Sequence, residues 1–217
     1  MARLSGPYPL RGAISRVPAN GGQPTTIAFQ YNPETLRRTL HPEMVGGEDQ
    51  DRSEAVRFTG PPVQTIAMDI EIDATDRLAQ NDAIAVKYGI APDLAILELL
   101  VYPDSRNVSR MTSLLNNGTI EVAPLTADRT LLIWGQQRVL PVRLTAYSIS
   151  EEAFDALLNP IRATVSLEMR VLNYTDLAAT NPDSHLFMAY QQELEAIAGK
   201  AQTVSGSTAT GVNITGS

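Results

Sequence analysis

The sequence contains no cysteine among its 217 residues. Disulfide bonds, thiolate metal sites and cysteine nucleophiles are therefore excluded together. Only two histidines are present, His41 and His185, whereas a histidine metal site needs two or three imidazoles that converge on the ion. The sequence also lacks the His-Glu-x-x-His, Gly-x-Ser-x-Gly and glycine-rich phosphate-binding patterns. These absences predict a protein that is not an enzyme and carries no cofactor.

Basic residues are few as well. Lysine and arginine total 17 against 24 aspartate and glutamate residues, which gives a net charge of −7 at pH 7. An acidic chain without a basic block lacks the electrostatic feature of a general nucleic-acid or anionic-membrane binder. No apolar run reaches the ~20 residues that span a bilayer, and the N-terminus lacks the apolar segment of a signal peptide. We therefore expect a protein made in the cytoplasm, with no nucleic-acid partner and no direct membrane insertion.

Apolar residues make up 43% of the chain, which is enough for a buried core. Several segments alternate apolar with polar residues, a period typical of half-buried strands. The clearest is 63–73, and the same pattern predicts strands at 25–31, 138–149 and 162–172. Two further strands are expected at 13–17, which is short, and at 130–134, which is apolar on both faces. In the strand at 138–149 we expect one side to carry Leu140, Val142, Leu144 and Ala146.

Helix signals follow the strand at 63–73 and recur near the C-terminus. Thr75 and Asp76 are expected to open a helix that continues to about 87 and ends at Gly89, and Pro92 opens a second short helix. Asn181 begins a final helix, while 107–124 shows no clear period and is expected to be irregular. The sequence thus predicts an α+β fold: a mainly antiparallel bent sheet or partly closed β-barrel with packed helices and a C-terminal helical extension. The expected parts are an arm at 1–24, a core at 25–180, and a helix with a Ser/Thr/Gly-rich tail at 181–217.

Two regions are predicted to contact other proteins. Residues 43–61 form a polar segment that is long for a connection within a domain, and such segments are often functional. On the final helix, three apolar residues share one face. The expected contact residues are Glu43, Glu48, Asp51, Arg52, Phe187, Tyr190 and Leu194. Trp134 and Arg162 are expected to support the core instead.

The acidic strand leaves a second hypothesis open. Asp69, Glu71 and Asp73 alternate along one strand face, and carboxylate oxygens are ligands for Ca²⁺ and Mg²⁺. The alternative function is therefore a carbohydrate- or metal-binding β module. Residues two apart on a strand are separated by ~7 Å, however, and converge poorly on one ion. A solvated face, or a face that meets a basic partner, is the competing interpretation.

The order of the elements resembles a known family. A strand runs into Asn-Pro-Glu at 32–34, an alternating strand ends in an acidic turn at 73–75, Trp-Gly stands at 134–135, and a strand carries Arg-Ala at 162–163. This pattern is similar to the tube-adaptor or inner-baseplate proteins of contractile injection systems, which are phage-tail-like particles. The positions that match are Asn32, Pro33, Asp73, Thr75, Trp134, Gly135, Arg162 and Ala163.

The resemblance implies a structural subunit that joins inner tube, central spike and baseplate wedges, with six copies around the particle axis. It also implies assembly in the cytoplasm of the producing bacterium, and it leaves open whether the particle stays in that cell or is released. Members often carry a C-terminal LysM module, and no such pattern follows Leu172. We therefore expect the final helix and the tail to contact the neighbours here.

Overall fold

The computed structural model describes residues 10–18, 22–45, 57–116, 128–178 and 180–201. Its centre is a seven-stranded sheet in the order β2-β1-β7-β8-β9-β6-β3, in which every pairing is antiparallel. Within these residues no pairing joins β2 to β3, so the sheet is open rather than a closed barrel. The strands are β1 (Ala13–Val17), β2 (Thr25–Ala28), β3 (Leu36–His41), β6 (Val63–Asp73), β7 (Arg129–Ile133), β8 (Val139–Phe154) and β9 (Pro160–Val171). The predicted α+β fold with an antiparallel bent sheet is confirmed.

Cross-strand register places the apolar residues of neighbouring strands on one face. Between β6 and β9, Ile66 lies opposite Met169 and Ile70 opposite Val165, and all four are at most 2% exposed. The alternation seen in the sequence therefore becomes one continuous apolar surface, because residues paired across antiparallel strands point to the same side. Ile14 of β1, a strand that falls in the expected N-terminal arm, lies in the same buried cluster.

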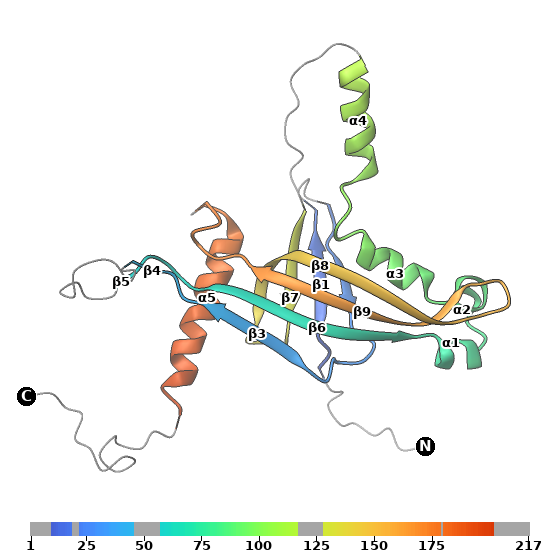
Figure 1. Cartoon of the computed structure of the whole chain (residues 1–217), viewed down its shortest axis with the longest axis horizontal. Helices are drawn as coiled ribbons and strands as arrows, with labels where there is room; N and C mark the ends of the chain where they lie inside the picture. The colour runs from blue at the N-terminus through green and yellow to red at the C-terminus, as the bar shows by residue number, and fades with distance from the viewer. Residues whose placement is uncertain (1–9, 19–21, 46–56, 117–127, 179, 202–217) are drawn as a thin grey trace, which may run out of the picture.

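The long strand β8 bends the sheet. Its residues 139–142 pair with β7, while its pairing with β9 runs from Val142 to Phe154. In Figure 1, β1 and β7 run behind β6, β8 and β9 and across them. The core lies between these two halves, where α3 (Ala91–Glu98) contributes Leu94 and Leu97 and α5 (Pro182–Ala198) contributes Phe187.

A β-bulge in β8 changes which residues face the core. Leu144 pairs with Met169, and Ala146 pairs with Glu168, the adjacent residue of β9. Thr145 is therefore an extra residue in β8. Because an extra residue reverses the alternation, Tyr147 packs against the core while Ala146 is exposed. The expectation that Ala146 shares the inner side with Leu144 is therefore wrong.

The helices after β6 are shorter than predicted. Asn81 adopts a positive φ of 54°, and the Asp82 carboxylate accepts the backbone N–H groups of Ile84 and Ala85 at 3.1 and 2.8 Å. This turn and new cap divide the expected helix into α1 (Thr75–Ala79) and α2 (Ala83–Tyr88), which ends at Gly89 as predicted. None of the helices in the described part of the chain is both long and apolar enough to cross a membrane.

The first part of the segment 107–124, for which no regular structure is predicted, instead belongs to the helix α4 (Ser105–Asn116). The Asp104 carboxylate accepts the backbone N–H of Arg106 at 2.9 Å and so caps the first turn. Asp104, an N-cap residue directly after Pro103, is the sequence signal for this helix, whose Ser, Asn and Thr content otherwise conceals it.

Strands also form in two places where alternation does not predict them. All six residues of β3 pair with β6, although consecutive Arg37 and Arg38 interrupt the apolar pattern. β4 (Met44–Val45) and β5 (Arg57–Phe58) pair Met44 with Phe58. The contact loop expected at 43–61 therefore has a two-stranded base, which lies away from the centre of the sheet (Figure 1), and its Met44 and Phe58 are exposed.

Candidate assembly surface

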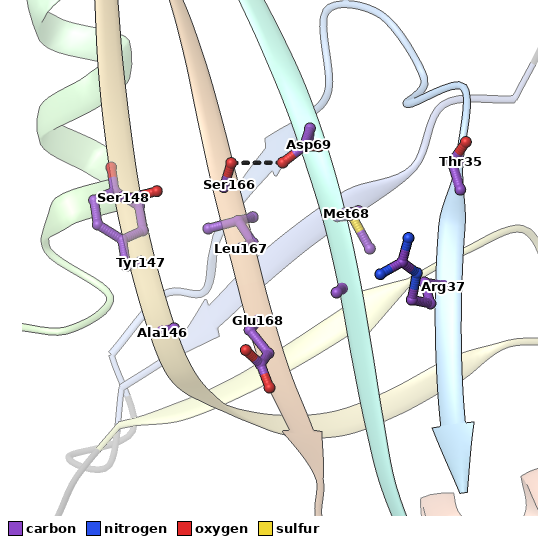
Figure 2. Close-up of a pocket in the computed structure, with 11 residues that line it drawn as sticks. Thr35, Arg37, Met68, Asp69, Ala146, Tyr147, Ser148, Ser166, Leu167 and Glu168 are labelled. Carbon is purple, nitrogen blue, oxygen red and sulfur yellow. Dashed lines mark hydrogen bonds between the residues drawn. The ribbon is translucent and has the colours of Figure 1, made fainter.

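The outer face of β3, β6, β8 and β9 is left open to solvent. In Figure 1, β1, β7 and α5 lie behind β6, β8 and β9, and no described helix lies in front of them. Figure 2 shows the centre of this face, a shallow hollow of about 450 Å³. Small or polar side chains line most of it, and Ser166 donates a hydrogen bond to Asp69 at 2.5 Å. Tyr147 also borders the hollow, but burial raises the pKa of its phenol to about 12, so it is neutral at neutral pH.

The four strands of this face end in two open edges. β3 pairs with β6 on one side, and β8 pairs with β9 on one side from Arg143 to Phe154. Within the described residues, neither strand has a partner on its other side there. The direction of the chain alternates from β3 through β6 and β9 to β8, so the two edge strands run in opposite directions. Such edges present unpaired N–H and C=O groups that pair with a further strand.

At one end of β6, Asp73 connects three segments of the fold. One carboxylate oxygen accepts the backbone N–H of Thr75 at 2.6 Å, and the other accepts the Nε–H of Arg162 at 2.7 Å. Burial by itself raises the pKa of Asp73, but the hydrogen bonds from Thr75 and Arg162 outweigh burial and hold the pKa below its usual 3.8. The Arg162 side chain is 46% exposed, so it belongs to an ion pair at the surface. From the sequence alone, Arg162 is instead expected to support the core.

Replacing Asp73 with asparagine is expected to reduce the free energy of unfolding at pH 7 by roughly 1–2 kcal/mol, the cost of weakening two charge-assisted hydrogen bonds. Because the pKa is lowered in the folded state, this stabilisation is complete above the unfolded pKa and is lost as the pH falls through the folded pKa. Urea unfolding of both proteins at pH 7 and pH 3 measures the effect. The difference between them should shrink at pH 3, and a difference of equal size at both values would contradict the role given to the carboxylate.

The segment that follows β2 holds the N-terminal strand in place. Asn32 accepts the backbone N–H of Gly12 at 2.8 Å and donates to the carbonyl of Leu10 at 2.9 Å. Gln30 makes a second pair of hydrogen bonds to the backbone N–H and C=O of Asp73, at 2.9 and 2.8 Å. Trp134 packs on the neighbouring Phe29 ring, with the ring centroids 6.5 Å apart. Asn32 and Trp134, which belong to the sequence resemblance, thus make contacts that support the fold. Gln30, which no motif predicts, connects the segment after β2 to Asp73.

The structure separates the predicted contact residues into three groups. Phe187 and Tyr190 are 6% and 7% exposed, because α5 packs them against the sheet, so their expected contact with a neighbour is corrected to an internal one. Leu194, one turn further on, is 43% exposed, and Glu43 is exposed beside β4. The remaining three, Glu48, Asp51 and Arg52, lie outside the described residues.

The acidic strand does not gather a metal-binding group. Asp69 is hydrogen-bonded to Ser166, and Asp73 is paired with Arg162, so their carboxylates are engaged separately. In the described part of the chain, no three Asp, Glu, His or Cys side chains come together as metal ligands would. The alternative of a metal-binding module therefore receives no support from the geometry.

A buried ion pair that sequence spacing does not predict fixes α5 on the sheet. Arg129 of β7 donates from its Nε to Asp183 at 2.8 Å and from its Nη2 to the other oxygen of the same carboxylate. Asp183 is 2% exposed and lies in the first turn of α5, which Asn181 caps at 2.9 Å. The two residues are 54 positions apart, so no local pattern relates them.

A family model described as contractile injection system tube protein matches residues 13–179. This match covers most of the chain, and the chain therefore belongs to the contractile injection system tube protein family. The family is structural and non-enzymatic, so this chain is a structural component of the tail or tube of a contractile injection system.

Two solved assemblies contain similar chains. One is described as the tail of an empty GTA particle with C6 symmetry: identity is 14%, the match covers 74% of this chain and 90% of that chain, and the TM-score is 0.30. The other is the six-fold symmetrised baseplate of the anti-feeding prophage: identity is 15%, coverage is 78% and 94%, and the TM-score is 0.25. No curated protein matches the chain.

Proposed function

We propose that this chain is a tube-adaptor subunit of the inner baseplate, which joins inner tube, central spike and baseplate wedges in a contractile injection system. Six copies surround the particle axis in this proposal. Assembly takes place in the cytoplasm of the producing bacterium. Membership of the tube protein family supports the structural role. The observation that carries the ring is the pair of open edges on β3 and β8.

The two edges suit each other as an interface between copies. Since β3 and β8 run in opposite directions, the β8 edge of one copy meets the β3 edge of the next in antiparallel pairing. A contact between two different surfaces of the same chain is heterologous, and repeating it generates a ring when the rotation closes. The uncovered outer face of the four strands then becomes one surface of that ring.

The ends of the long strands supply surfaces for further partners. Phe58, in the hairpin of β4 and β5, is 74% exposed, and Leu157, in the turn between β8 and β9, is 79% exposed. In Figure 1 these two features lie at opposite ends of the molecule. Exposed apolar side chains grouped at such sites mark protein interfaces. We therefore assign one end, with the 43–61 loop, to one neighbouring layer and the opposite end to the other.

Cysteine cross-linking tests the ring directly, because the chain has no cysteine of its own. Thr39→Cys on β3 is combined, one at a time, with Ala146→Cys, Ser148→Cys or Ser150→Cys on the outer face of β8. Side chains opposite each other on paired strands are close enough for a disulfide. We expect one of the three combinations to give a ladder of covalent oligomers that ends at six copies.

The single-cysteine variants are the matched controls, and they should form no species larger than a dimer. The proposed ring is overturned if none of the three combinations forms a ladder at concentrations where the wild-type chain assembles. A ladder that closes at another number would correct the copy number alone.

The adaptor role requires a second measurement, on whole particles. Gln80→Cys places a single thiol at the exposed end of α1, where a small gold label can be attached. Electron microscopy of labelled particles should show gold in one layer at the junction of tube and baseplate. Gold that repeats along the whole tube would assign the chain to the tube itself and would contradict the adaptor role.

A further inference from the structure

The helix α4 has an apolar side that the described residues leave largely exposed. Figure 1 shows it projecting away from the sheet beyond β8. Val108 and Met111, three residues apart, share one side of the helix, and Leu114 flanks them. Val108 and Leu114 are each 43% exposed. A helix with an apolar stripe normally buries that stripe, so α4 is built to lie in a groove.

The charge of α4 restricts the kind of groove. The helix carries two arginines and no acidic residue, although the chain as a whole has a net charge of −7. Arg106 is already paired with Asp104 at 2.7 Å. Arg110 is exposed and has no ion-pair partner among the described residues. A groove with an apolar floor and a carboxylate at its rim is the complement.

The same chain has such a groove at its other side. A hollow of about 380 Å³ lies between the second half of α5 and the turn that joins β7 to β8. Its apolar lining includes Trp134, Leu194 and Ile197, and the last two are 43% and 40% exposed. Its charged lining is one Glu193 and one Arg138, and Glu193 has no ion-pair partner within the described part of the chain.

The places of the two features indicate which molecule supplies the helix. In Figure 1, α4 projects past the β8 edge, whereas the end of α5 and the β7–β8 turn lie on the β3 side. A displacement that brings the β8 edge of one copy onto the β3 edge of the next therefore also carries α4 toward the groove of that next copy. A helix of twelve residues is about 18 Å long, enough to cross from one copy to its neighbour.

We propose that α4 of each copy docks in the groove between α5 and the β7–β8 turn of the adjacent copy. This inference rests on the proposed ring and adds a second contact to the paired edges. Val108 and Met111 enter the apolar floor beside Trp134 and Leu194, and Arg110 faces Glu193 at the rim. In this contact the neighbouring copy covers the exposed Leu194. Phe187 and Tyr190 of the same helix keep α5 packed on the sheet of its own copy.

Charge exchange between the two surfaces tests the contact. Arg110→Glu and Glu193→Arg are each expected to weaken self-association of the full chain about fivefold, measured by sedimentation velocity, because each replaces an attraction with a repulsion. An equimolar mixture of the two variants should recover, since the carboxylate introduced on α4 of one variant then meets the guanidinium introduced in the groove of the other. Val108→Asp is expected to weaken self-association more than either charge variant, because it places a carboxylate on the apolar floor.

Ser109→Glu is the matched control, because it adds a negative charge to the side of the helix opposite Met111 and Leu114, where it does not face Arg110, and it should leave self-association unchanged. Unchanged association of Val108→Asp and of both charge variants overturns the inference, as does a wild-type chain that remains monomeric at the highest concentration reached. The Thr39→Cys cross-links separate the two proposals. If they form while the α4 variants have no effect, the docking of α4 fails and the ring stands.

Discussion

Replacing Gly89 with alanine is expected to destabilise the protein by about 4 kcal/mol or more, enough to prevent folding of a typical domain. Gly89 has φ 60° and ψ −129°, a conformation open almost only to glycine. A Cβ atom at this position would stand 2.0 Å from the carbonyl oxygen of Pro160, which accepts the backbone N–H of Ile90 at 2.8 Å. Because that oxygen belongs to the backbone of β9, it cannot move aside without breaking the contact between the sheet and the helices.

Urea unfolding of the purified variant, with the soluble yield as a second measure, tests this expectation. Gly135→Ala is the matched control: its φ is 75°, but a Cβ there has no atom within 4 Å. It should cost only about 1 kcal/mol, the usual penalty of a left-handed backbone. Equal losses from the two substitutions would show that backbone strain, and not the collision with Pro160, limits position 89.

Asp183→Asn is expected to lower the free energy of unfolding by about 3 kcal/mol. The substitution keeps the shape of the side chain but removes the charge of a carboxylate that is 3% exposed and accepts two hydrogen bonds from Arg129. Solvent reaches the Arg129 side chain, which is 32% exposed, so the loss arises from the buried carboxylate side of the pair. The loss is measured by urea unfolding at pH 7, and α5 should exchange its amide hydrogens faster than the β6–β9 core.

Asp93→Asn provides the comparison with an exposed ion pair. Asp93 lies 2.6 Å from Arg77, and both side chains are more than a third exposed. Such a pair contributes about 1 kcal/mol or less. If Asp183→Asn costs no more than Asp93→Asn, then apolar packing of Phe187 and Tyr190 fixes α5 on the sheet, and the buried pair is dispensable.

The ring and the docking of α4 assign different tasks to the two faces of the sheet. The inner face, with α3 and α5, forms the core of each copy. In the proposed ring the open edges on β3 and β8 join copies, and the outer face between them is lined mainly by small and polar side chains. This division accounts for a sheet that is apolar on one side only and for a chain whose function needs no catalytic group.

Periodicity predicted most of the sheet, because the alternation of side chains along a strand is a local property. The strands at 63–73 and 162–172 were located to within two residues. The order of motifs also indicated a contractile injection system, which the family match at 13–179 confirms. The assignment to the adaptor position within that system is finer than the match and stays a proposal.

Local patterns failed where a residue's environment depends on a distant segment. The extra residue at Thr145 reverses β8 only because β9 keeps its own register beside it. Phe187, Tyr190 and Leu194 lie on one face of α5. The first two are buried against the sheet, whereas Leu194 is exposed. The strand β3 contains two adjacent arginines and exists because β6 offers it a free edge.

The sequence by itself determined the fold class, the apolar sides of β6 and β9 and the absence of catalytic chemistry, because these follow from composition and from the spacing of neighbouring residues. Only the tertiary structure decided which edges remain open among the described residues, that α4 projects from the sheet, and where the hollow beside α5 lies. Such features depend on contacts between residues that are distant in the sequence, as Arg129 and Asp183 are, 54 positions apart. Contacts of this kind leave no repeating pattern in the neighbouring residues, so they cannot be predicted from periodicity.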